Sequence, residues 1–253
     1  MLHRWLAVLQ LFLTAFTFAW AGPVQAQSTS QNDDSDSGLD ALPAEERGDL
    51  LMLRHAYVEA TYAYSLAPVN AVVWNKMGIA YHHLLAIGEA RSDYEKALRL
   101  QPDYADAMNN LGATYFAEGN YRKAIGLYMR ALRLTPASAV FTANLGTAYF
   151  AQGKEKQGAD AYRSAFKLDP NIFDLNSAQI IQGPTNRQER ARLDFCLAEL
   201  YASSKNNERA LDYLHQALSA GYLDRKRLMD APAFADLRTT PEFTEFLAEF
   251  ASR

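Results

Sequence analysis

The few residues able to do chemistry form no recognisable catalytic arrangement. Cys196 is the only cysteine of the chain, so no disulfide can form within it. A nucleophilic thiol needs a base held beside it, and nothing in the sequence places His215, the nearest histidine, next to Cys196. We interpret Cys196 as a structural or inert thiol that is partly exposed.

The remaining histidines do not indicate a metal site. His82 and His83 are adjacent on an expected helix, where they point about 100° apart. Histidine pairs that chelate one ion from a helix are usually four residues apart. The sequence also lacks a phosphate loop, a Gly-x-Ser-x-Gly elbow, a His-Glu-x-x-His motif and a dinucleotide fingerprint. We predict no catalytic residue, no metal and no cofactor, so the chain is not expected to be an enzyme.

Composition indicates an ordinary globular protein. Of the 253 residues, 49% are hydrophobic and 21% are charged, which is enough apolar sequence for a sizeable core. The formal net charge is −4. Nucleic-acid binding favours a basic face, so no nucleic-acid partner is expected.

The elements that must position the remaining residues come from an internal repeat. Between Ala71 and Ile172, four residue types recur with a period of 34 residues. Such a period indicates a helical repeat protein. The repeated residues are Gly78, Gly112 and Gly146; Tyr81, Tyr115 and Tyr149; Ala97, Ala131 and Ala165; and Pro102, Pro136 and Pro170.

Each repeat predicts two helices, A and B. Numbered from 1 at Ala71, Ala105 and Ala139, its positions 4, 7, 8 and 11 share one face of helix A. Glycine at position 8 of all three repeats argues for close approach of a second helix, because glycine otherwise destabilises a helix by about 1 kcal/mol. Positions 20, 24, 27 and 30 share one face of helix B, which the proline at position 32 ends.

These features resemble the tetratricopeptide-repeat family at nearly every signature position of residues 71–172. The resemblance implies an all-α, right-handed superhelical solenoid of antiparallel helix pairs. It also implies that the A helices line a concave groove, which binds a segment of a partner protein. The basic residues with which some family members clamp a terminal carboxylate are absent, so that mode is not expected.

Positions 5, 6 and 12 of helix A face or border the groove in this family. Asparagine side chains there could pair with a peptide backbone, and aromatic side chains could hold apolar anchors. A purely structural role stays open for both, because asparagine is common in the family at position 6 and position 12 can serve packing between repeats. The predicted partner-binding residues are Asn75, His82, Asn109, Asn110, Phe116, Asn144 and Phe150.

The amino-terminal residues predict export. A short positive start precedes an apolar run from Trp5 to Trp20, and small residues at Val24 and Ala26 suit a cleavage site. We interpret residues 1–26 as a secretory signal peptide and the polar, acidic residues 27–42 as a disordered linker. The alternative is an uncleaved membrane anchor, although the apolar run is short for a membrane span of about 20 residues.

The rest of the chain divides around the repeats. We expect one long helix over residues 43–66, and a displaced turn in the first repeat, where Leu85 stands in place of a glycine. Solenoids need a terminal cap over their last apolar face. The boundaries are 43–70 for an amino-terminal helix or half repeat, 71–104, 105–138 and 139–172 for three repeats, 173–190 for an insertion, 191–224 for a degenerate fourth repeat, and 225–253 for capping helices.

Taken together, the sequence favours an exported, non-enzymatic scaffold in the periplasm or cell envelope of a bacterium. Its expected partner is a segment of another protein, and its expected membrane contact is transient, through the signal peptide. One alternative is an assembly factor anchored by an uncleaved amino-terminal helix. Another is an envelope enzyme, which would need paired carboxylates or an activated nucleophile facing one pocket.

Overall fold

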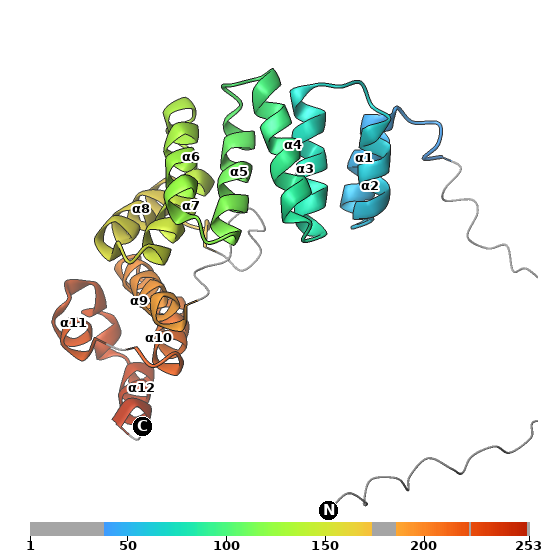
Figure 1. Cartoon of the computed structure of the whole chain (residues 1–253). Coiled ribbons are helices and arrows are strands. Elements are labelled where there is room, and N and C mark those ends of the chain that lie inside the picture. The colour runs from blue at the N-terminus through green and yellow to red at the C-terminus, as the bar shows by residue number, and fades with distance from the viewer. Residues whose placement is uncertain (1–37, 174–185, 223, 252–253) are drawn as a thin grey trace, which may run out of the picture. The chain divides into compact units, whose positions relative to one another are not determined.

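The computed structural model describes residues 38–173, 186–222 and 224–251 (Figure 1). Within these ranges the chain is helical and has no strand. None of the helices in them is long and apolar enough to cross a membrane. The predicted signal peptide, most of the linker and most of the insertion lie outside the described residues.

The helices belong to one compact unit that begins at Leu42, and most of them form successive antiparallel pairs. In each pair we call the first helix A and the second B. The pairs are α1 (Ala44–Leu53) with α2 (Tyr57–Ser65), α3 (Ala71–His83) with α4 (Ile87–Leu100), α5 (Ala105–Ala117) with α6 (Tyr121–Leu134), α7 (Ala139–Ala151) with α8 (Glu155–Leu168), and α9 (Arg187–Ser203) with α10 (Asn207–Ser219).

All five pairs turn in the same way between helix A and helix B. The residue at position 15 has a left-handed backbone, as in Gly119 with φ 76°. The Gly119 N–H donates to the Phe116 carbonyl at 2.9 Å, and the next N–H, of Asn120, donates to Tyr115 at 2.8 Å. Leu85 adopts the same geometry with φ 58°. The expected displacement of the turn at Leu85 is therefore wrong, because these hydrogen bonds hold even a side chain that disfavours this conformation.

The single helix expected over residues 43–66 is also wrong. The chain breaks at His55, which has φ 59° and the same turn hydrogen bonds, so α1 and α2 form a complete helix pair. The spacing between equivalent residues of this pair and of the next pair is shorter than the period of 34 residues. The buried residues Ala60, Tyr64 and Ala67 lie 30 residues, not 34, before their counterparts Ala90, Tyr94 and Ala97.

A tyrosine ring packed against a glycine joins the two helices of each of the first four pairs. A Cβ atom added at Gly112 of α5 would lie only 2.6 Å from the Tyr128 ring of α6. Gly48, Gly78 and Gly146 meet the tyrosine of their own B helix in the same way. The repeated glycine is therefore required by close packing, as the sequence predicted, and the partner is the tyrosine at position 24.

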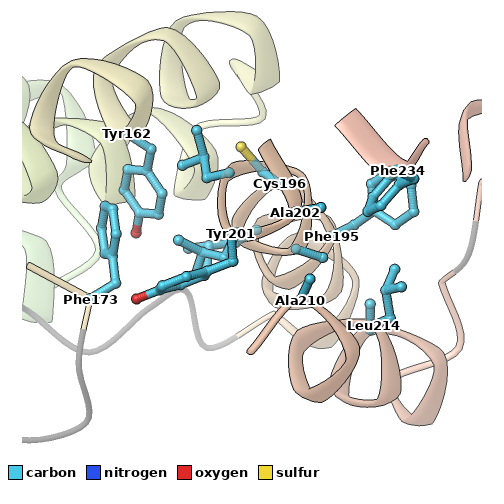
Figure 2. Close-up of a cluster of buried hydrophobic side chains, with 14 of the residues drawn as sticks. Tyr162, Phe173, Phe195, Cys196, Tyr201, Ala202, Ala210, Leu214 and Phe234 are labelled. Atoms are coloured by element: carbon cyan, nitrogen blue, oxygen red, sulfur yellow. The ribbon is translucent and has the colours of Figure 1, made fainter. Parts of the chain in front are cut away.

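The chain ends in a cap that covers the last pair. α11 (Arg225–Asp230), the 3₁₀ turns η1 (Pro232–Phe234) and η2 (Leu237–Thr239), and α12 (Pro241–Ala251) follow α10, and η1 and α12 pack on α9 and α10. Phe234 and Leu237 are fully buried there. Figure 2 shows Phe234 beside Phe195, in the same cluster as Tyr162, Cys196 and Tyr201. The capping role predicted for this segment matches these contacts.

Two glycine substitutions test the packing against tyrosine. Gly112→Ala forces a methyl group into the Tyr128 ring, and overpacking of this kind lowers the free energy of unfolding by about 1–3 kcal/mol. Gly126→Ala is the matched control, because nothing lies within 4 Å of its added Cβ on the exposed side of α6. It should raise the free energy of unfolding by about 0.5–1 kcal/mol. Urea unfolding measures both, and equal effects of the two variants would contradict the packing argument.

Candidate functional site

The A helices form a continuous inner face. α3 packs against α5, α5 against α7, and α7 against α9, whereas contacts between successive B helices are weaker or absent among the described residues. Helices that approach each other along one side of a stack form its inner curve. Positions 5 and 6 lie along this side, because their asparagines bond from one A helix to the next. Position 12 follows position 5 by seven residues and so lies on the same helical face. The sequence predicted a partner-binding groove at these positions.

Asparagine side chains on this face are bonded to one another. Asn110 of α5 donates from Nδ2 to Oδ1 of Asn75 on α3 at 3.0 Å. Within α5, Asn109 donates to Asn110 at 3.2 Å, and Asn144 of α7 donates to Asn109 at 2.9 Å. The four amides make one chain of hydrogen bonds across three A helices, which we call the asparagine ladder.

The asparagine ladder is mostly closed to a partner. Asn144 exposes none of its surface, and Asn75 and Asn109 expose 5% and 6%. Asn110 is half-buried. Buried amides require hydrogen-bond partners, and these side chains find them in each other. Asn110 is the member of the ladder that a partner could still reach.

The aromatic residues at position 12 do not form a continuous exposed stripe. His82 and Phe116 are half-buried, and the Phe116 ring centroid lies 5.2 Å from that of Tyr121. Burial, and then the proximity of His83, lower the pKa of His82, so the ring is neutral at physiological pH. Phe150 is only 2% exposed and packs against Tyr162. Phe150 is therefore unavailable to a partner in this structure.

The burial of Phe150 has a cause in the neighbouring B helix. Position 20 is Gly158 in α8, and a Cβ added there would lie 2.6 Å from the Phe150 ring. The preceding repeats have Ala90 and Ala124 at this position. The missing methyl group lets the Phe150 ring lie against α8. The replacement of alanine by glycine is the signal in the sequence from which this difference could have been predicted.

The structure also places the residues with reactive side chains. The expectation that Cys196 is partly exposed is wrong, because it is 5% exposed in the core around α9. Burial raises the pKa of its thiol to about 12, which keeps the sulfur protonated and unreactive. Within the described residues, no group of three or more His, Cys, Asp or Glu side chains could hold a metal ion.

Asp194 is a buried carboxylate on α9. Its nearest charged partner, Arg190, places Nε 3.7 Å from Oδ1. Burial raises the pKa of Asp194 to about 6, and the arginine opposes this only in part. The folded state therefore holds this proton more tightly than the unfolded state, whose Asp pKa is about 3.9.

Asp194→Asn tests the consequence for stability. Because the folded pKa is raised, the contribution of Asp194 to stability is present at low pH and is lost as the pH rises from about 4 through about 6. The free energy of unfolding of the wild type should fall relative to Asp194→Asn, by at most about 1.4 kcal/mol per pH unit. Urea unfolding at pH 4 and pH 7 measures this, with Asp160→Asn on the exposed surface of α8 as the control for a lost charge. A difference that does not vary with pH would contradict it.

Comparisons with known proteins agree with the repeat. Tetratricopeptide-repeat models match residues 70–137 and 114–172. No curated protein matches the chain.

Several solved structures are similar in fold. One titled "Crystal structure of MamA protein" is 19% identical, with a TM-score of 0.49, and the match covers 75% of this chain and 93% of that one. MamA from Desulfovibrio magneticus RS-1 is 19% identical, with a TM-score of 0.49 and coverage of 74% and 96%. YrrB, titled a TPR protein with an unusual peptide-binding site, is 18% identical, with a TM-score of 0.47 and coverage of 81% and 95%. The match to the repeat models and the observed helix pairs together show that residues 70–172 are tetratricopeptide repeats within an all-α solenoid.

Proposed function

We propose that the chain is a non-enzymatic scaffold that binds a segment of a partner protein on the A helices of its first two repeats, α3 and α5. The observation that carries this proposal is that His82, Asn110 and Phe116, at the predicted binding positions of these two helices, are only half-buried. An aromatic ring supplies an apolar anchor, and an amide can donate to and accept from a peptide backbone. The binding face is smaller than the sequence suggested, because Asn144 and Phe150 of α7 are buried.

The face on α3 and α5 is preorganised for this role. The asparagine ladder fixes Asn110 between Asn75 and Asn109, so little side-chain entropy remains to be lost when a partner binds. Packing on Tyr121 restrains the Phe116 ring in the same way. The non-enzymatic part of the proposal rests on the sequence, which pairs no nucleophile with a base and shows no cofactor motif.

Export to the periplasm or cell envelope of a bacterium is part of the same proposal. Its support is the sequence of residues 1–26, in which a positive start, an apolar run and small residues before Gln27 follow the order of a secretory signal. A scaffold exported in this way would meet its partner outside the cytoplasm.

Loss of one aromatic side chain tests the binding face. Phe116→Ala should reduce capture of a partner from an envelope extract by about tenfold or more, because truncation of a central aromatic anchor removes at least about 1.4 kcal/mol of binding. Leu134→Ala is the matched control, since Leu134 is an exposed apolar residue at the end of the B helix α6. Quantitative mass spectrometry of captured proteins measures the effect, and circular dichroism checks that both variants fold. Equal capture by Phe116→Ala and wild type would place the binding surface elsewhere.

The first residue of the protein made in a bacterial host tests export. Cleavage of the signal peptide predicts Gln27 as the amino terminus of the protein in the periplasmic fraction. Amino-terminal sequencing of that fraction measures it. A protein that retains Met1 and sediments with membranes would instead support the anchored assembly factor.

A further inference from the structure

A pocket of about 420 Å³ lies between α3 and α4, and the asparagine ladder does not line it. It combines apolar and aromatic side chains of α3 with charged side chains of α4. Its lining residues are Trp74, Met77, Tyr81, Gly88, Glu89, Ser92, Asp93 and Lys96. Two carboxylates and one lysine therefore face a space walled on its other side by tryptophan, tyrosine and methionine.

Asp93 is the unusual residue of this pocket. Its side chain is 4% exposed, and its Oδ2 atom finds no hydrogen-bond partner among the described residues. A buried carboxylate oxygen without a partner destabilises the fold, and burial raises the pKa of Asp93 against the opposing hydrogen bond from Lys96. The other helix pairs have uncharged residues at this position, namely Ala63, Leu127, Ala161 and Tyr213. The carboxylate is therefore not needed to build a repeat.

The pocket already holds a cation of the chain itself. The Lys96 Nζ atom lies 4.0 Å from the centroid of the Trp74 ring and donates to Asp93 Oδ1 at 2.6 Å. A cation on an aromatic face, held by a carboxylate, is a recognised arrangement for binding positive groups. An ammonium group uses one oxygen of Asp93 here, and the second oxygen is buried without a partner, so a ligand reaches it only when Lys96 moves aside. A planar guanidinium can bond to both oxygens at once.

The preceding helix pair explains why the pocket is open. In the second repeat the equivalent Leu127 shares an apolar cluster with Leu98 of the preceding B helix. In the first repeat the preceding B helix is α2, which ends at Ser65, and the residue corresponding to Leu98 is the exposed Pro68. The short α2 therefore places no leucine at this site. The residue at the repeat position of Leu127 is the charged Asp93.

We propose that this pocket binds the guanidinium group of an arginine side chain on the partner segment, with Asp93 as its carboxylate and Trp74 as its aromatic wall. Binding moves Lys96 off the tryptophan ring and satisfies both oxygens of Asp93. This inference rests on the proposed function and adds to it the chemistry of the partner, which carries at least one arginine. α3 carries residues of the pocket as well as His82 of the binding face, so the two sites share one helix.

The probes are three short peptides of alanine with a single central arginine, citrulline or lysine. Citrulline has nearly the shape of arginine without its charge, and lysine has the charge without the planar fork. The protein is the full chain with Trp5→Phe and Trp20→Phe, which leaves Trp74 as the only tryptophan. Its fluorescence should change saturably with the arginine peptide. Binding of the citrulline peptide should be at least about tenfold weaker, and that of the lysine peptide several-fold weaker.

Variants of the pocket separate binding from folding. Asp93→Leu copies Leu127 of the next repeat, so it should fold and lose the fluorescence response, and Asp93→Asn should lose it while keeping the shape of the side chain. Glu95→Gln, on the same helix and outside the pocket lining, should bind as wild type does. Lys96→Met removes the internal competitor and should tighten binding several-fold. Thermal unfolding by circular dichroism confirms that each variant is folded.

Three outcomes of the peptide titrations would overturn the assignment, besides a complete absence of peptide binding. These are equal binding of the arginine and citrulline peptides, equal binding of the arginine and lysine peptides, and retained binding in Asp93→Leu. The experiments distinguish failure of the proposed binding face on α3 and α5 from failure of the proposed arginine pocket. If the arginine peptide does not bind but Phe116→Ala still reduces capture of the partner, only the proposed arginine pocket is contradicted. If the arginine peptide binds but Phe116→Ala does not change capture of the partner, only the proposed binding face is contradicted.

Discussion

The contact on which this solenoid depends is a tyrosine ring of helix B lying on a glycine of helix A. At Gly112 the ring of Tyr128 occupies the space that a Cβ atom would fill, and the same contact recurs in the neighbouring pairs. It sets how closely the two helices of a pair approach. Because the two helices approach each other in the same way in each of these pairs, successive pairs stack with their A helices on one side. The positions of Asn110 and Phe116 on a common face follow from that stacking.

The polar residues on that face link the repeats together. An apolar interior allows helices to slide, because apolar contacts are not directional. The hydrogen bonds from Asn110 to Asn75 and from Asn144 to Asn109 have definite geometry, and each joins one A helix to the next. Their amides are satisfied only in one register. The asparagine ladder therefore stabilises the arrangement of the A helices and leaves Asn110 at its accessible edge.

Comparison of residues at the same position of different repeats separates structural roles from local ones. Where three copies agree, as at the glycine of position 8, the residue serves the helix pair itself. Where one copy differs, the difference has a local consequence: Gly158 in place of alanine buries Phe150, and Asp93 in place of an uncharged residue puts a carboxylate in a pocket. The burial of Phe150 leaves the accessible groups of the A-helix face on α3 and α5. The carboxylate of Asp93 belongs to the separate pocket between α3 and α4.

The amino-acid sequence is enough to predict the helix pairs of residues 71–172, their period and the residues that face inward within each repeat, because a helical period of 3.6 residues assigns every side chain to a face. The helical period alone does not predict how far a side chain on that face is exposed. Phe116 and Phe150 occupy the same repeat position, yet one is half-buried and the other buried, because the neighbouring B helix has alanine in one case and glycine in the other. The break at His55 is hidden from the sequence for a similar reason. Its left-handed backbone is held by hydrogen bonds and by packing of Tyr64 on Gly48, two residues that meet only when the chain folds.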